Sequence, residues 1–167
     1  LDITIVTGVS DPSLSAVGNT IGVGVNTGGT LLSGTTNPAT GLSFRGTELL
    51  FNTSSGSASP TTYFGATASG TNFRNAFGAS GNAAQIDMPM SIQDQSDSFN
   101  KRIVTEGLAN GLRVKRTFSF GLNDSFVAVD IRLTNTTAKS MEDVMWMEAF
   151  NPNMGANLFP RLEEPAS

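Results

Sequence analysis

The stretch from Gly111 to Asn153 constrains the fold more than any other part of the chain. Apolar and polar residues alternate along residues 112–120 and 126–133, and a third apolar segment follows at 144–150. A period of two places one set of side chains on each face of a β-strand. Asn110-Gly111 is a residue pair that two-residue hairpin turns prefer. The stretch therefore predicts neighbouring antiparallel strands, each with one buried face.

Shorter apolar segments precede this stretch at roughly ten-residue spacing, with turn-forming Gly, Pro, Asn and Ser between them. In residues 21–25 apolar residues alternate with glycine. Residues 42–51 fit either a strand pair that turns at Arg45-Gly46 or a single bulged strand. No long amphipathic helix stands out. The pattern predicts an all-β fold, an antiparallel β-sandwich with long Gly/Ser/Thr-rich loops.

Residues 67–82 are the least regular part of the chain. Phe73 and Phe77 stand four residues apart, which is a helical spacing, but small polar residues surround them. A short helix and a loop pinned by the two aromatic rings both fit this pattern. The nearby glycines favour the loop, because glycine lowers helix stability.

The chain has 167 residues, which is enough for one domain with a substantial core. We expect residues 1–160 to form a single β-sandwich domain. Residues 161–167 contain charges and a proline and are expected to form a linker-like tail. The last strand of the alternating stretch resembles a central strand, so we also expect a later segment of a longer protein to complete the sandwich.

Composition disfavours several classes of function. The chain lacks cysteine and histidine, which removes disulfides, zinc–thiolate sites and the Ser-His-Asp triad. Its net charge of −4 disfavours nucleic acid as a partner. No apolar run is long enough to cross a membrane, so a membrane partner is not expected. The abundance of Gly, Ser, Thr and Asn is typical of an extracellular β-rich protein, for which Ca²⁺ would replace disulfides as a stabilising link.

Oxygen-rich loops supply the candidate metal ligands. Asp94 and Asp97 lie in a polar loop between two predicted strands, and Asn151 and Asn153 flank a proline at the end of the last one. Carboxylate and amide oxygens are ligands that Ca²⁺ accepts, although it requires six to eight of them. The alternatives are an ordinary solvated loop for the aspartates and an ordinary turn for the asparagines.

Other polar and aromatic residues have both a structural and a functional interpretation. Arg113, Lys115 and Arg116 fit a solvated strand face better than a basic binding patch. Trp146 fits a core position better than an exposed sugar platform, with Met145 and Met147 on the opposite face of the strand.

The strand carboxylates Glu48, Glu106 and Glu148 raise the alternative of a glycosidase, but their spacing does not place two of them across a cleft. With one Trp and one Tyr, Tyr63, the chain also lacks the aromatic platform of a lectin, so we expect any sugar site to lie in another module.

Three runs carry a resemblance to a known family: Gly-Leu-Ala-Asn-Gly-Leu-Arg-Val at 107–114, Phe-Val-Ala-Val-Asp-Ile-Arg-Leu-Thr-Asn at 126–135 and Met-Glu-Ala-Phe-Asn-Pro-Asn at 147–153. Together they resemble β-sandwich domains in the ligand-binding region of large RTX-type bacterial surface adhesins. Those domains include split sandwiches that an inserted module interrupts and Ca²⁺-dependent peptide-binding domains. The family pattern often has aspartates on both sides of the proline, whereas this chain has Asn151 and Asn153, which implies weaker Ca²⁺ binding.

The resemblance implies a secreted protein at the bacterial cell surface. We expect a non-catalytic adhesin module that supports or positions neighbouring or inserted ligand-binding modules in cell adhesion and biofilm formation. The alternative is direct Ca²⁺-dependent binding of a host or microbial surface peptide or glycan. A polysaccharide-acting enzyme is the third and least favoured interpretation.

Overall fold

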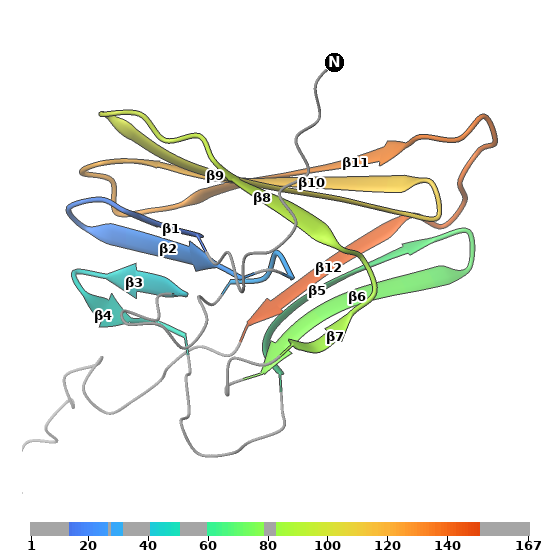
Figure 1. The fold of residues 1–167 in the computed structure, drawn as a ribbon, viewed down its shortest axis with the longest axis horizontal. Coiled ribbons are helices and arrows are strands. Elements are labelled where there is room, and N and C mark those ends of the chain that lie inside the picture. The colour runs from blue at the N-terminus through green and yellow to red at the C-terminus, as the bar shows by residue number, and fades with distance from the viewer. Residues whose placement is uncertain (1–13, 27, 32–40, 51–59, 79–82, 151–167) are drawn as a thin grey trace, which may run out of the picture.

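The computed structural model describes residues 14–26, 28–31, 41–50, 60–78 and 83–150 (Figure 1). In these ranges every regular element is a β-strand, and all the strands pair antiparallel in three four-stranded sheets. The all-β class is confirmed, and the arrangement is consistent with the predicted β-sandwich. The predicted N-terminal strand and the tail at 161–167 lie outside the described residues, as do Asn151 and Asn153.

We number the sheets I to III and give the order of the strands in each. Sheet I contains β1 (Leu14–Val17), β2 (Ile21–Val25), β3 (Leu42–Phe44) and β4 (Thr47–Glu48) in that order. Sheet II has the order β11-β10-β9-β8, from β8 (Met90–Asp94), β9 (Asn100–Ala109), β10 (Leu112–Gly121) and β11 (Ala128–Asn135). Sheet III has the order β12-β5-β6-β7, from β5 (Pro60–Ala68), β6 (Thr71–Gly78), β7 (Ala83–Ile86) and β12 (Met145–Phe150).

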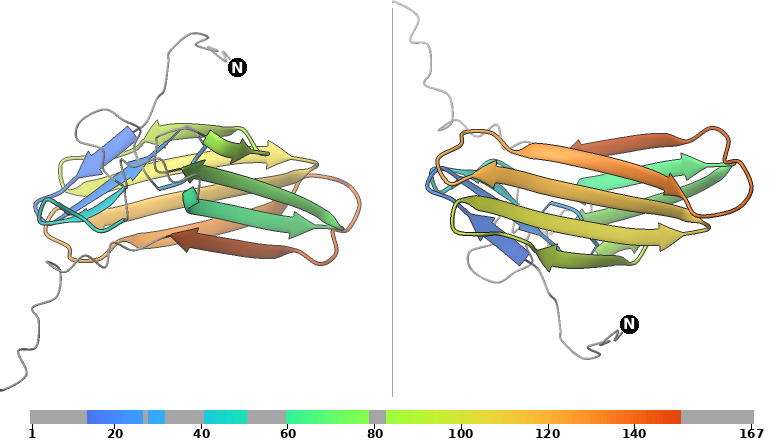
Figure 2. Two further views of the ribbon diagram at one scale, coloured as in Figure 1. Left: turned by 90° about the horizontal axis from the view of Figure 1, so that it is seen from below. Right: turned by 90° about the horizontal axis from the view of Figure 1, so that it is seen from above.

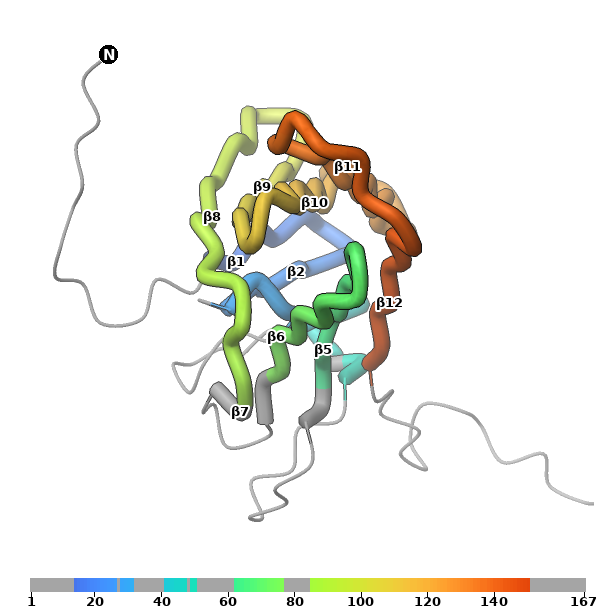
Figure 3. The backbone as a smooth tube through the Cα atoms, turned by 90° about the vertical axis from the view of Figure 1, so that its right-hand side faces the viewer, coloured from blue at the N-terminus to red at the C-terminus, as the bar shows by residue number. Residues whose placement is uncertain are grey.

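The three sheets form two layers. Sheet II makes one layer, and sheets I and III lie next to each other in the opposite layer (Figures 1 and 2). The end view shows the same separation, with β8 to β11 above β5, β6, β7 and β12 (Figure 3). The long strand β10 contributes to both halves of the interior. Phe118 and Phe120 pack with sheet I, whereas Leu112 and Val114 pack with sheet III.

Three two-residue turns set the register of the hairpins. The turns are Arg45-Gly46, Ser69-Gly70 and Asn110-Gly111, and both residues of each turn have positive φ. Such turns match the twist of antiparallel strands. The predicted hairpin at Asn110-Gly111 is confirmed, and residues 42–48 form a strand pair as one of the two interpretations expected.

The expected loop or short helix in residues 67–82 is wrong, because β5 ends at Ala68 and β6 occupies Thr71–Gly78. The alternation of β6 is hidden by Asn75, which is polar but fully buried. Its amide nitrogen donates to the carbonyls of Gly28 and Met88 at 2.8 and 2.7 Å. Its oxygen accepts from the backbone N–H groups of Asp87 and Met88. These bonds compensate the loss of hydration that burial of an amide costs.

The predicted solvated position of Arg116 is also wrong, because its side chain is completely buried between the two layers. One terminal nitrogen donates to the carbonyl of Gly29, and the other forms an ion pair with the Glu148 carboxylate. The guanidinium lies 4.8 Å from the ring centroids of both Phe64 and Phe118. Burial lowers the pKa of Arg116, and the charge of Glu148 opposes that effect. Paired charges and aromatic faces explain how the sandwich accepts an arginine.

Candidate functional site

The described candidate metal ligands are occupied in holding their own loop. One Asp94 oxygen accepts from the Ser96 backbone N–H at 2.9 Å, and one Asp97 oxygen accepts from the N–H groups of Phe99 and Asn100 at 2.7 Å each. Hydrogen bonds with the Ser96 side chain and backbone lower the pKa of Asp94, and those with Phe99 and Asn100 lower the pKa of Asp97. Such bonds are the usual role of aspartate in turns.

The geometry fits Ca²⁺ only in part. The second oxygen of Asp97 accepts a long hydrogen bond from the Asn100 side chain at 3.4 Å, and no cluster of three or more acidic, His or Cys side chains forms among the described residues. Two carboxylates fall short of the six to eight oxygens that Ca²⁺ takes. The proposed contribution of Asn151 and Asn153 lies outside the described residues. Calcium binding therefore stays a prediction.

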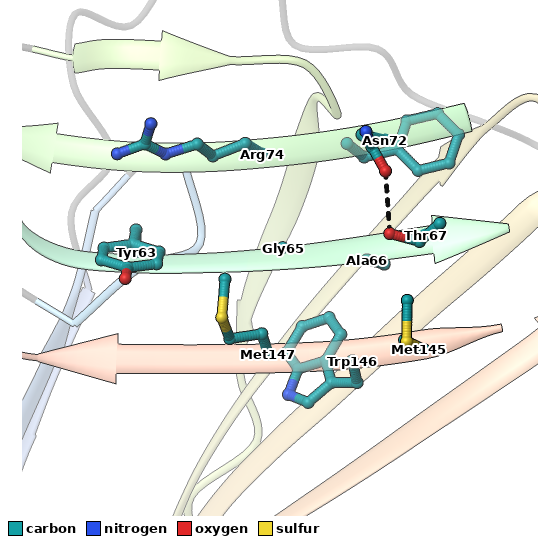
Figure 4. A pocket seen from close by; sticks show the side chains of 10 residues that line it. Tyr63, Gly65, Ala66, Thr67, Asn72, Arg74, Met145, Trp146 and Met147 are labelled. Carbon is teal, nitrogen blue, oxygen red and sulfur yellow. Dashed lines mark hydrogen bonds between the residues drawn. The ribbon is translucent and has the colours of Figure 1, made fainter. Parts of the chain in front are cut away.

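A groove of about 630 Å³ crosses the outer face of sheet III. It runs over β12, β5 and β6 and is mostly apolar (Figure 4). Ten residues line it: Tyr63, Gly65, Ala66, Thr67, Asn72, Phe73, Arg74, Met145, Trp146 and Met147. A large, partly apolar concavity with a few polar groups is the usual form of a small-ligand site.

Gly65 forms the floor of this groove. Strand pairing places Gly65 opposite Met147 on one side and opposite Arg74 on the other. Because Gly65 has no side chain, this row has a gap between the thioether and the guanidinium (Figure 4). A Cβ atom added there would come 3.2 Å from the carbonyl oxygen of Phe73, so a small adjustment of the strand would accept it.

Polar groups line the β6 side of the groove. The guanidinium of Arg74 lies over the ring of Tyr63, 5.0 Å from its centroid. The Thr67 hydroxyl donates to the side-chain oxygen of Asn72 at 2.9 Å, and the Asn72 amide nitrogen lies on the side away from Thr67 (Figure 4). Arg74 and Asn72 are exposed, while Tyr63 and Thr67 are partly buried. Donor groups therefore predominate on this side.

Apolar side chains line the β12 side. Met145 is 62% exposed and Met147 is 57% exposed, and both stand on the outer face of β12. Trp146 points inward, where it stacks on Phe64 with 5.1 Å between ring centroids. The prediction that Met145 and Met147 lie on the strand face opposite Trp146 is confirmed. Neighbouring exposed apolar side chains mark interaction surfaces more often than isolated ones do.

The interior determines which face of β12 reaches the groove. Glu148 is bound to Arg116, and Trp146 packs on Phe64, so both point into the sandwich. Alternation then places Met145 and Met147 outside. A slip of one residue would reverse every side chain of the strand. The buried ion pair is thus part of the structural basis of the groove.

Two of the three strand glutamates, Glu106 and Glu148, do not form a catalytic pair with each other. Glu148 faces the interior from sheet III, and Glu106 binds Arg113 at 3.5 Å on sheet II. The side chain of Glu48 lies outside the described residues. Glycoside hydrolysis by the common mechanism requires two carboxyl groups on either side of one bond. Glu106 and Glu148 do not meet that requirement.

A second hollow of about 410 Å³ lies at the end of sheet II. Asp97, Lys101, Arg102, Ser119 and Asp124 are among its lining residues. One Asp124 oxygen accepts from the N–H of Gly121 at 2.7 Å, so this carboxylate holds its own turn, as Asp97 does. The hollow therefore contains the predicted Asp97 but no gathered metal ligands among the described residues.

Comparison with protein-family models, curated proteins and solved structures finds no match to this chain. Within the part of the chain that the structure describes, no helix has the length and apolarity to span a bilayer. The groove on sheet III is thus the main structural evidence from which a function can be inferred.

Proposed function

We propose that this chain is a non-catalytic carbohydrate-binding module of a bacterial surface adhesin, and that the groove on sheet III is its binding site. The observation that carries the proposal is the gap over Gly65, which is bordered by Arg74 on β6, by Met147 on β12 and by Tyr63 farther along β5. The groove combines an apolar surface with hydrogen-bond donors. A saccharide presents apolar C–H faces together with hydroxyl groups, so the two surfaces match.

The position of the groove favours a saccharide over a peptide. Peptides that bind sheets commonly add a strand at an edge, where backbone groups are unpaired. β5 lies at the centre of the groove and already pairs with β12 and β6 on its two sides. A ligand on this face must therefore be recognised by side chains. Hydroxyl groups and ring substituents suit that form of recognition.

The lining residues support binding without catalysis. Among the described residues that line the groove there is no Asp or Glu, so it lacks the carboxyl pair of most glycosidases. We expect polysaccharides incubated with the protein to keep their chain length. The measurement is the release of new reducing ends, with heat-denatured protein as the control. Chain shortening that depends on groove residues would contradict the non-catalytic assignment.

The adhesin setting rests on the sequence. The three runs within residues 107–153 resemble adhesin sandwich domains, and the composition suits an extracellular protein. The expectation that a sugar site lies in another module assumed that sugar recognition needs several exposed aromatic rings. A groove floored by glycine and flanked by methionine offers another kind of apolar contact. If no saccharide binds, support of a neighbouring module is the remaining function.

The test is binding to immobilised polygalacturonate, its methyl ester, dextran and xylan, followed by affinity electrophoresis. We expect retardation by at least one of them, and we expect Gly65→Val to abolish it by filling the groove. Ser119→Val is the matched control, because it fills the hollow on sheet II instead. Circular dichroism confirms that both variants fold. Absence of retardation by all four polysaccharides, or equal loss in both variants, would contradict the proposal.

A further inference from the structure

The charges around the groove indicate which saccharides it would accept. Arg74 is the single charged residue among those that line it, in a chain whose net charge is −4. The described part of the chain places no carboxylate within ion-pair distance of the Arg74 guanidinium. A lone guanidinium in a site without acidic side chains attracts an anion.

Arg74 is held in a defined position without a partner anion. Its guanidinium stacks over Tyr63, which orients the planar group while leaving its N–H edge accessible. Its backbone N–H donates to Asp87 at 2.9 Å, and the same Asp87 oxygen accepts from Gln85 at 2.8 Å. That Asp87 oxygen is thus engaged with these two N–H groups. A positioned guanidinium binds a carboxylate through two parallel hydrogen bonds.

Asn72 provides a second recognition group on the same face. It is two residues before Arg74 on β6, which corresponds to roughly 7 Å along a strand. Its oxygen is used by Thr67, so its amide has N–H groups left to donate. One sugar unit could therefore place a carboxylate on Arg74 while a hydroxyl or ring oxygen accepts from Asn72. The apolar face of that unit would lie over Gly65 against Met147.

We infer that the groove recognises an acidic saccharide, in which a carboxylate on the sugar ring binds Arg74. The inference rests on the proposed function and adds the chemical class of the ligand. Uronic acids of microbial or plant polysaccharides and terminal sialic acids both carry such a group. Galacturonate oligomers and a sialyl-oligosaccharide are therefore separate arms of the test, and binding of either supports the inference.

The experiment measures dissociation constants by isothermal titration calorimetry. The ligands are galacturonate oligomers, their methyl esters and a sialyl-oligosaccharide, at two salt concentrations. Methyl esterification removes the charge and keeps the sugar backbone. We expect an acidic ligand to bind roughly tenfold to a hundredfold more tightly than the ester, which is the usual effect of a charged hydrogen bond. Arg74→Gln should remove this preference, so that the acid and the ester bind with similar dissociation constants.

Arg45→Gln is the matched control, since Arg45 is also exposed and stacked on an aromatic ring, Phe44, but does not line the groove. We expect it to bind as the wild type does. Equal binding of acid and ester, with both lost in Gly65→Val, would overturn the acidic preference and leave the groove as a neutral-sugar site. Acid binding that survives Gly65→Val, or that falls equally in both arginine variants, would overturn the location. Failure of every saccharide would overturn the proposed function as well.

Discussion

Arg116 on β10 and Glu148 on β12 form an ion pair inside the sandwich, and this pair joins the two layers beneath the groove. The arginine is completely buried, while the glutamate side chain is 25% exposed. Removing one partner of a buried pair leaves the other charge without compensation, which costs more than the pair itself contributes. The contact therefore affects both the stability of the fold and the orientation of β12.

We expect Glu148→Gln to lower the free energy of unfolding by about 3 kcal/mol, because it leaves the Arg116 guanidinium buried without a counter-ion. Urea denaturation measures the change. The control is Glu106→Gln, which breaks the exposed pair with Arg113 and should cost less than about 1 kcal/mol. The free energy of unfolding of the double variant Arg116→Leu/Glu148→Leu should be closer to that of the wild type than the value for Glu148→Gln is. Equal costs for the two glutamate variants would contradict the structural role of the buried pair.

Asn75 is expected to be a second residue on which stability depends. Asn75→Leu keeps the volume but leaves the carbonyls of Gly28 and Met88 and two backbone N–H groups without their partner. Because these buried polar groups would be unpaired, we expect the free energy of unfolding to fall by on the order of 3 kcal/mol, as measured by urea denaturation. Asn72→Leu, on the exposed face of the same strand, should change stability by about 0.5 kcal/mol or less. A similar loss in both variants would argue against the buried network.

Asp97 should make the stability of its loop depend on pH. Its hydrogen bonds from Phe99 and Asn100 lower its pKa from the ordinary value of 3.8. A carboxyl with a lowered folded-state pKa stabilises the protein above its unfolded pKa and loses that effect as the pH falls through the folded value.

We therefore expect Asp97→Ala to melt at a lower temperature than the wild type at pH 7. Below about pH 4 the two melting temperatures should converge. Asp97→Asn keeps an oxygen acceptor, so its melting temperature should fall less than that of Asp97→Ala. The difference from wild type should also depend less on pH. Differential scanning calorimetry across this pH range is the measurement. A wild-type advantage over Asp97→Ala that persists undiminished in acid would show that the carboxylate does not act in this way.

The calcium prediction is checked by melting the protein in EDTA and in millimolar Ca²⁺. An ion that binds only the native state raises the melting temperature. If Asp94 and Asp97 take part in the predicted site, we expect such a rise, and Asp97→Asn should reduce it because the charge is lost. An unchanged melting temperature in wild-type protein would contradict Ca²⁺ binding. The same result would leave the saccharide proposal intact, because the groove requires no metal ion.

Local turn chemistry made part of the fold predictable. Asn110-Gly111 indicated its hairpin correctly because a two-residue turn with positive φ leaves few alternatives. Ser69-Gly70 forms the same kind of turn, but the strand after it was missed. The buried amide of Asn75 interrupts the apolar alternation, and its partners Gly28 and Met88 are distant in sequence. A polar residue buried by non-local bonds does not show a period-two pattern.

Arg116 and the groove were unpredictable for a related reason. The burial of Arg116 depends on Glu148, which is 32 residues away, and on the rings of Phe64 and Trp146 from other strands. The groove depends on the register that places Gly65 between Met147 and Arg74. A single sequence does not specify that register. One usable signal was the alternation at Met145, Trp146 and Met147, which correctly separated the two faces of β12.

Gly65, which forms the floor of the groove, also affects how the binding surface could evolve. On β5, Phe64, Ala66 and Ala68 pack into the interior, while Tyr63, Gly65 and Thr67 border the groove. Substitutions at the second set would alter ligand choice with little penalty to folding. We expect descendants of a common ancestor to keep the inward residues and to diversify the outward ones. A single codon, that of Gly65, would then be enough to open or close the binding surface.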